Sequence, residues 1–337
     1  MAQFPNSTGP NSGVWTLEDV YNARIGGNWP ATLAGDRGVY AGGNNPSLHD
    51  TIDIITVSTT GNATDFGNLT SSRSSLQGVG SKTRAVFSAG FNPANNNVMD
   101  YITFASAGNA VDFGDMLTDY EGFGCGTGVN DNTRGIWGGG YTPGNVNTIQ
   151  FITIASTGNS TDFGDLLAAN TGANAACSPT RGVMAGGNPG SGAGTNVMQY
   201  ITTQSAGNAI DFGDLSGVRR LNGGNSSATR GIFAGGYTSP TGALNVIDFI
   251  TIATTGNAQD FGDLATATSN TSTTSNTIRA VMGGGNVPSN VKTDKIEFVT
   301  IATRANATDF GDLTVATRDK SSSSNNHGGL QEFQPRA

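Results

Sequence analysis

An all-β propeller of six blades is the fold that this sequence predicts, from two repeated markers and from the composition. The tripeptide Asp-Phe-Gly occurs six times, with spacings of 47, 50, 49, 49 and 49 residues. An arginine that precedes Gly or Ala and then an apolar run also recurs six times, with spacings of 47, 50, 47, 49 and 49. A period of this length is typical of one propeller blade. The 50 glycines and only 12% charged residues indicate many short strands joined by tight turns.

The two markers divide each repeat in the same way. The arginines are Arg37, Arg84, Arg134, Arg181, Arg230 and Arg279. The Asp-Phe pairs of the tripeptide are Asp65 and Phe66, Asp112 and Phe113, Asp162 and Phe163, Asp211 and Phe212, Asp260 and Phe261, and Asp309 and Phe310. Because the phenylalanine stands at one fixed place in every repeat, we expect all six to be buried between blades.

The repeat that begins at Arg230 shows how one blade is built. An apolar strand over residues 230–234 ends at the pair Gly235-Gly236, and residues 245–253 form a second strand rich in β-branched and aromatic residues. Gly256-Asn257 is a hairpin signal before a third strand over 259–264. The Ser/Thr/Asn/Ala linker that follows can hold a fourth, short strand before the next arginine.

These repeats predict three regions. Residues 1–30 form an N-terminal arm and attachment segment, residues 31–330 form the propeller, and residues 331–337 are a C-terminal tail. The repeat cores lie near residues 37–69, 84–117, 134–166, 181–215, 230–264 and 279–313, with a closing segment at 320–330. Either residues 29–36 or residues 321–327 could supply the strand that closes the ring. The C-terminal segment is favoured, since joining both ends in one blade removes free sheet edges.

Charge and hydropathy exclude several partners. The net charge is −8, and an acidic protein repels phosphate backbones, so we expect no nucleic-acid partner. No apolar run is long enough for a transmembrane helix, and the first residues lack the pattern of a secretory signal. We therefore expect no membrane insertion. Cys125 and Cys177 do not make a disulfide framework, and free buried thiols are the better interpretation.

No residue pattern predicts an enzyme, a cofactor or a metal. His49 lies in a variable loop and His327 in the closing segment, and neither stands near a nucleophile motif. Acid pairs such as Asp162 and Asp165 lack the clustered oxygen ligands of a calcium loop, so turn or bulge roles are favoured. The arginines could bind an anion around a ring. The favoured alternative is that each guanidinium bonds carbonyls or an Asp of its own or the adjacent blade.

The repeat resembles the kelch repeat over roughly residues 37–328. Kelch blades carry a glycine pair, here in five repeats, with Ser88-Ala89-Gly90 in the second. The aromatic of the following strand matches Tyr101, Phe151, Tyr200, Phe249 and Phe298, with Ile54 in the first repeat. The phenylalanines of Asp-Phe-Gly replace the tryptophan that kelch repeats usually carry. This resemblance implies architecture and says little about activity.

A narrower resemblance links the chain to kelch-like structural proteins of tailed phages, especially cyanophages. It depends on the ITIASTGN…TDFGDL style of the repeat, on residues 13–30 and on residues 324–330. It implies a non-enzymatic virion structural protein in a tail, fibre or capsid-surface position, made in the host cytoplasm, with other virion proteins as partners. The alternative is a host-recognition module that binds a surface glycan or a receptor protein through the propeller loops.

Two groups of residues are candidates for these contacts. Apolar residues of a short helical face before the first blade could attach the ring to a partner, and they are Trp15, Leu17, Val20, Tyr21, Ile25 and Trp29. Aromatic residues that directly follow a strand-ending glycine could bind a ligand in the loops, and they are Phe91, Tyr141 and Tyr237.

Overall fold

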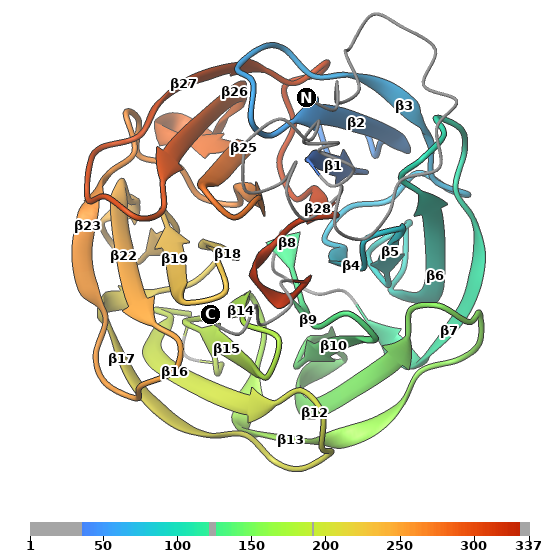
Figure 1. The fold of residues 1–337 in the computed structure, drawn as a ribbon, viewed down its shortest axis with the longest axis horizontal. Coiled ribbons are helices and arrows are strands. Elements are labelled where there is room, and N and C mark those ends of the chain that lie inside the picture. Colours follow the sequence, from blue (N-terminus) through green and yellow to red (C-terminus); the bar gives the residue numbers. More distant parts are fainter. Residues whose placement is uncertain (1–35, 121–125, 191, 331–337) are drawn as a thin grey trace, which may run out of the picture. The chain divides into compact units, whose positions relative to one another are not determined.

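Six four-stranded antiparallel sheets surround a common axis in the computed structural model, which describes residues 36–120, 126–190 and 192–330. The chain divides into two units, residues 1–34 and residues 35–337, and the described residues belong to the second. The six sheets are arranged as the blades of a propeller (Figure 1). The all-β, six-bladed prediction is therefore confirmed.

Each of the first three blades has an inner strand at the axis and an outer strand at the rim. Blade 1 contains β28 (Ser321–Ser324), β1 (Arg37–Ala41), β2 (Thr51–Thr56) and β3 (Thr64–Asn68). Blade 2 contains β4 (Gln77–Gly80), β5 (Arg84–Ser88), β6 (Asn96–Thr103) and β7 (Val111–Tyr120). Blade 3 contains β9 (Val129–Asn130), β10 (Arg134–Gly138), β12 (Gly144–Thr153) and β13 (Thr161–Asn170), with short β11 (Tyr141–Thr142) paired to β12. Short β8 (Gly126–Thr127) pairs in parallel with β4 and β28 and so links the inner strands of blades 1 and 2.

The other three blades follow the same plan. Blade 4 contains β14 (Asn174–Cys177), β15 (Arg181–Ala185), β16 (Thr195–Thr202) and β17 (Ile210–Arg219). Blade 5 contains β18 (Gly223–Ser226), β19 (Arg230–Ala234), β22 (Val246–Thr251) and β23 (Gln259–Asp263), with a hairpin of β20 (Tyr237–Thr238) and β21 (Gly242–Ala243). Blade 6 contains β24 (Ser272–Ser275), β25 (Arg279–Val287), β26 (Val291–Thr300) and β27 (Thr308–Asp312). Two 3₁₀ turns are η1 (Pro288–Asn290) and η2 (Gly328–Leu330).

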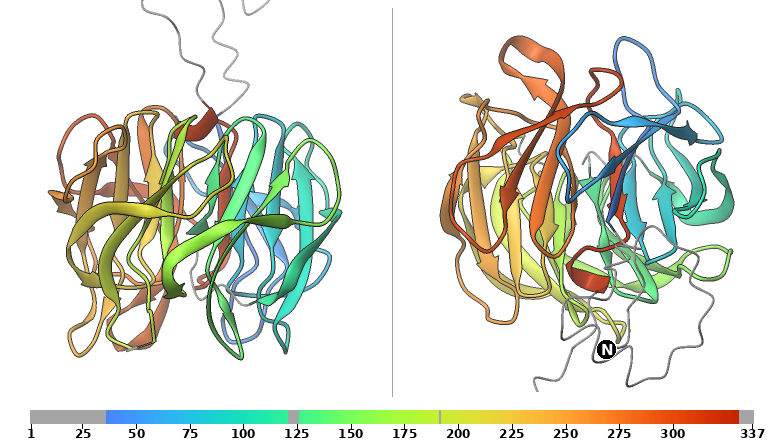
Figure 2. Two further views of the ribbon diagram at one scale, coloured as in Figure 1. Left: turned by 90° about the horizontal axis from the view of Figure 1, so that it is seen from below. Right: turned by 45° about the horizontal axis from the view of Figure 1, so that its top comes forward.

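The C-terminal strand closes the ring, as the sequence favoured. β28 pairs antiparallel with β1, so that the last strand of the chain is the innermost strand of the first blade. Arg37 N donates to Asn325 Oδ1 at 2.9 Å, which places the two ends of the described chain beside each other. We call this end of the ring the terminal face. The opposite end, where each blade's second strand turns into its third, we call the loop face (Figure 2).

The hydrophobic core is divided into six clusters, one at each junction between adjacent blades. The cluster between blades 3 and 4, for example, joins Phe163 and Leu166 to Met184 and Ile201. The other five clusters repeat this arrangement around the ring, including the one between blades 6 and 1. The six phenylalanines of Asp-Phe-Gly are at most 4% exposed, which confirms that they are buried between blades. Five of them meet the aromatic of the neighbouring strand edge to face at 5.7–6.1 Å between centroids.

The turn before each Asp-Phe-Gly binds the outer strand of the preceding blade. In blade 4, Gly207 N donates to Phe163 O at 2.8 Å, and Asn208 Oδ1 accepts from Asp165 N at 3.0 Å. The asparagine contact recurs at all six junctions. Gly164 of the tripeptide has φ +149°, and a Cβ on it would lie 2.5 Å from Gly207 O. The tripeptide needs its glycine because the next blade's turn lies against it.

Small polar side chains fill the axis of the ring. β24 and β28 read Ser-Thr-Thr-Ser and Ser-Ser-Ser-Ser, and all eight residues are buried. Their hydroxyls bond to backbone of the neighbouring inner strand, as where Ser322 Oγ donates to Thr273 O at 2.7 Å and Ser324 Oγ to Ser275 O at 2.6 Å. Buried hydroxyls are tolerated when they are paired, and in these two strands Ser321 Oγ is a buried hydroxyl that has no partner among the described residues. The Ser/Thr linkers of the sequence are therefore the polar centre of the fold, which their composition alone did not indicate.

Candidate binding site on the loop face

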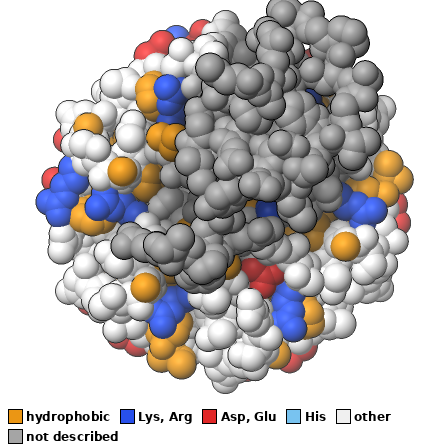
Figure 3. Space-filling view, viewed as in Figure 1, with side chains coloured by type: hydrophobic (Ala, Val, Ile, Leu, Met, Phe, Trp, Pro, Cys, Tyr) orange, Lys and Arg blue, Asp and Glu red, His pale blue; other side chains and the backbone are white. Residues whose placement is uncertain are grey.

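The six repeated arginines fasten each blade to the next. Arg181 Nη1 donates to Ile252 O at 3.0 Å and to Ala253 O at 2.9 Å in the following blade, while its guanidinium lies 4.4 Å from the Tyr200 ring centroid of its own blade. The other five arginines also donate to carbonyls of the following blade, and four of them stack on their own blade's aromatic. Figure 3 shows basic and hydrophobic side chains side by side at intervals around the terminal face. The favoured carbonyl-bonding interpretation is confirmed.

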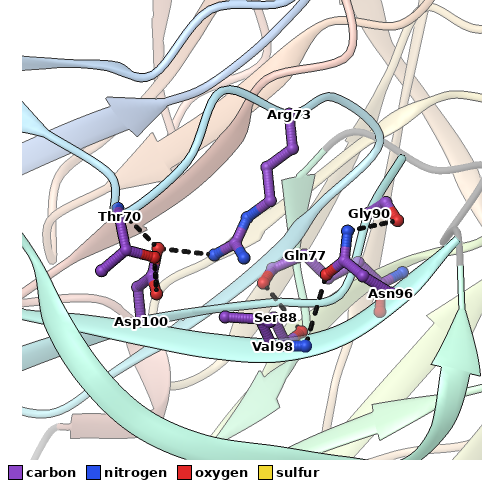
Figure 4. A network of polar contacts seen from close by, with 8 residues as sticks. All are labelled: Thr70, Arg73, Gln77, Ser88, Gly90, Asn96, Val98 and Asp100. Carbon is purple, nitrogen blue, oxygen red and sulfur yellow. Dashed lines mark hydrogen bonds and ion pairs between the residues drawn. The ribbon is translucent and has the colours of Figure 1, made fainter. Parts of the chain in front are cut away.

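An acceptor side chain at one position of each blade receives the linker from the preceding blade. Asp100 accepts from Thr70 N at 3.1 Å and from Arg73 Nη2 at 2.7 Å, and both charged side chains are fully buried (Figure 4). Arg219 and Asp248 repeat this ion pair, and Lys320 lies 3.3 Å from Asp53 Oδ2. In blades 3, 4 and 6 the acceptors are Gln150, Gln199 and Glu297, each bonded to the backbone N–H five residues after the Asp of Asp-Phe-Gly in the preceding blade. These charged and amide side chains therefore connect each blade to the one before it.

The histidines and the described cysteine have structural surroundings. His49 lies in a loop, with Nε2 2.9 Å from Asn45 O. His327 is buried at the axis, with Nε2 3.2 Å from Gly80 O and Nδ1 3.8 Å from Cys177 Sγ. Burial lowers the pKa of His327 to about 4 and raises the pKa of the free Cys177 thiol. Cys125 and the predicted attachment residues from Trp15 to Trp29 lie outside the described residues.

The loop face is built on two repeated positions. One is the residue after the strand-ending glycines, and the other lies in the linker, nine residues after the Asp of Asp-Phe-Gly. Backbone hydrogen bonds pair these positions, as where Tyr237 N donates to Arg220 O at 2.7 Å and Asn286 N to Ser269 O at 2.7 Å. The paired backbone is constant while the side chains vary: Asn44, Phe91, Tyr141, Asn188, Tyr237 and Asn286 occupy the first position.

A cavity of about 490 Å³ opens on the loop face over blades 5 and 6. Three consecutive linkers contribute Arg220, Ser269 and Arg318 to its lining at the same position of the repeat. Tyr237 and Asn286 line it from the other repeated position, and the β20–β21 hairpin and η1 complete it. Its volume is within the range of sites that hold small ligands.

Two cationic side chains set the electrostatics of this cavity, whose lining includes no carboxylate. The Arg220 guanidinium lies 5.3 Å from the Tyr237 ring centroid. Arg318 Nε lies 3.2 Å from Asp319 Oδ2 just outside the lining. Buried Nε of Arg220 and buried Oδ1 of Asn286 have no hydrogen-bond partner among the described residues. Such unpaired polar atoms in a cavity favour a polar ligand.

The predicted loop aromatics are only partly brought to this site. Tyr237 lines the cavity, whereas Phe91 and Tyr141 are each 37% exposed and are not among its lining residues. The sequence interpretation missed Arg220, Arg318 and Asn286 because the residue type at these two repeated positions varies from blade to blade. A signal was present: arginine occupies the same linker position in the fourth and sixth repeats, where the other repeats carry Ser, Thr or Glu.

The comparisons with known proteins add no family. No protein-family model and no curated protein matches this sequence. Within residues 36–120, 126–190 and 192–330, no group of three His, Cys, Asp or Glu side chains is arranged to hold a metal ion. In the same part of the chain, no helix has the length and apolar character to cross a membrane.

Proposed function

We propose that this protein is a non-enzymatic, kelch-like structural component of a virus particle, in a tail, fibre or particle-surface position, where it makes protein–protein contacts. The resemblance of its repeats and of its terminal segments to phage structural proteins supports this proposal. The observation that carries it is the polarity of the ring. Both ends of the described chain, Asp36 and Leu330, lie on the terminal face, while the variable loops lie on the loop face.

This polarity suits a displayed module. A partner attached through either terminal segment would hold the terminal face and leave the loop face directed outward. The six junctions, each with a hydrophobic cluster, an arginine contact and a bound turn, make a closed ring without free blade edges at its seam. A rigid ring of this kind can hold the loop face in a fixed position relative to a partner that is attached at the terminal face.

The first experiment asks whether the chain belongs to the particle. Mass spectrometry of gradient-purified virions of the virus that encodes it should detect the chain in constant proportion to other particle proteins. A variant lacking residues 1–28 should fold and melt like the full chain but no longer join the particle. Finding the chain only in the infected-cell lysate would overturn the proposal. Failure of the truncated ring to fold would overturn the role of residues 1–28 in attachment.

A second candidate function is recognition of a host surface glycan or protein through the loops. The cavity between Arg220 and Arg318 favours it, because structural contacts alone do not require a small, polar, open site. Labelled protein should bind to host cells, and Arg220→Gln should reduce that binding while incorporation into particles is unchanged. Equal binding of the variant and the unmodified protein would reject this candidate.

A further inference from the structure

We infer that the loop-face cavity binds a carboxylate-bearing saccharide. The inference deepens the recognition function proposed above and does not depend on the virion assignment. It begins with the repeat: the linkers before blades 5, 6 and 1 place Arg220, Ser269 and Arg318 at one equivalent position, and all three line the cavity. Two arginines therefore line one cavity, and the linker between theirs contributes a small serine at the equivalent position.

The charge of the cavity is opposite to that of the chain. The protein carries a net charge of −8, yet the lining has two arginines and no acid. Asp319 faces Arg318 and offsets part of its charge, whereas no ion pair of Arg220 exists within the described residues. The Arg220 guanidinium lies over the Tyr237 ring, 5.3 Å from its centroid, and this contact restricts where the guanidinium can lie. A planar guanidinium of this kind matches a carboxylate with two parallel hydrogen bonds.

The rest of the lining matches hydroxyl groups. Asn286 is 8% exposed, and its Oδ1 has no partner among the described residues, so the buried amide can accept a hydrogen bond from a ligand. Ser269 and Asn270 are buried beside it, and η1 adds Ser289 and Asn290. Neutral donors and acceptors around one cationic site suit a molecule with a single anionic group and several hydroxyls. A sugar acid has this chemistry, and the volume of about 490 Å³ accommodates one or two sugar units.

The test compares matched acidic and neutral sugars on the intact protein. Immobilised oligosaccharides should be probed in pairs that differ only by a carboxylate, for example cellobiouronic acid against cellobiose, with isothermal titration of the best pair. We expect binding to acidic members and at least about tenfold weaker binding to their neutral partners, the effect of one charge-assisted hydrogen bond. Added salt should weaken binding of the acid.

Two variants assign the binding to this cavity. Arg220→Gln and the near-isosteric Asn286→Asp should each weaken binding of the acidic sugar about tenfold or more, because one removes a cation and the other adds an anion. Arg304→Gln is the matched control, since Arg304 bonds Gln259 in the exposed part of blades 5 and 6 away from the cavity. Thermal melts establish that all three variants are folded.

The contrary outcomes are distinct. Equal binding of acidic and neutral sugars, or no binding to any acidic member, would overturn the inference. Equally tight binding of inorganic sulfate or phosphate would show an anion site without saccharide recognition, which also overturns it. If Arg304→Gln weakened binding as much as Arg220→Gln, the ligand would lie elsewhere. If protein still bound host cells while every acidic sugar failed, recognition would stand and the ligand class would be wrong.

Discussion

The repeated residues of this protein act mainly at the junctions between adjacent blades. Each residue of the two repeated markers contacts a neighbouring blade. The arginine donates to carbonyls just after the third strand of the following blade, and the phenylalanine packs in the hydrophobic cluster between the two blades. The sequence predicted both roles, because a residue type that recurs at a fixed place six times must do the same work six times. It could not predict the direction of the contacts, which depends on the order in which strands follow the axis.

Phe163 provides the simplest test at this scale. It is 3% exposed and lies in the cluster between blades 3 and 4, so Phe163→Ala should lower the free energy of unfolding by about 3–5 kcal/mol. Leu167→Ala on the same strand is the control, since Leu167 is 52% exposed and should change stability little. Urea unfolding followed by fluorescence measures both. An unchanged midpoint for Phe163→Ala would contradict the assignment.

His327 predicts a dependence of stability on pH. Burial lowers its pKa from 6.5 to about 4, so the folded ring holds the neutral imidazole. As the pH falls through 6.5, His327 becomes protonated in the unfolded chain, whereas in the folded chain it stays neutral until about pH 4. The stabilisation is therefore complete above pH 6.5 and is lost between pH 6.5 and 4.

The comparison of two proteins isolates this effect. Between pH 7.5 and pH 5, the unmodified protein should lose about 2 kcal/mol more of its free energy of unfolding than His327→Gln does. Carboxylates elsewhere titrate in both proteins and cancel in the difference. Identical pH profiles for the two proteins would mean that His327 is already protonated, or accessible, in the folded ring.

At the scale of elements, the linkers are the part of the fold that the sequence concealed. Their Ser, Thr and Asn residues have the composition of surface loops, yet β24 and β28 are fully buried at the axis. Hydrogen bonds between residues 49 positions apart pair hydroxyls such as those of Ser322 and Ser324, and no local signal in the sequence reports such a contact. The same limit explains why the cavity was missed, because its arginines come from linkers 98 positions apart (318 minus 220).

The energetic coupling between Arg73 and Asp100 can be tested with side chains that another junction of the same ring already uses. Arg73→Asn alone leaves Asp100 buried without its cation and should cost about 3–5 kcal/mol. Adding Asp100→Gln copies the Asn170 and Gln199 arrangement of the junction between blades 3 and 4, where Gln199 Oε1 accepts from Leu167 N at 2.8 Å. The double variant should recover more than half of the loss in urea unfolding. Losses that simply add would show that the two side chains do not interact in solution.

At the scale of the molecule, the sequence was sufficient for the number of blades and left the closure of the ring open. Both terminal segments offered a candidate strand, and the period of the repeat treats them alike. The pairing of β28 with β1 decides between them for the described residues. The ring thus brings residues such as Gly38 and Ser324, 286 positions apart (324 minus 38), into one sheet.

The closure can be tested directly with a paired cysteine variant. In the register of β1 and β28, Ala41 lies opposite Ser321, so their Cα atoms should be about 4.5–5.5 Å apart, within reach of a disulfide. With Cys125 and Cys177 replaced by Ser, the variant Ala41→Cys/Ser321→Cys should form an intramolecular cross-link under mild oxidation, identified by peptide mass mapping. Ala41→Cys/Ser324→Cys, displaced by three residues or about 10 Å along β28, should not. Absence of the first cross-link, or equal yields from the two pairs, would contradict a ring closed by its C-terminal strand.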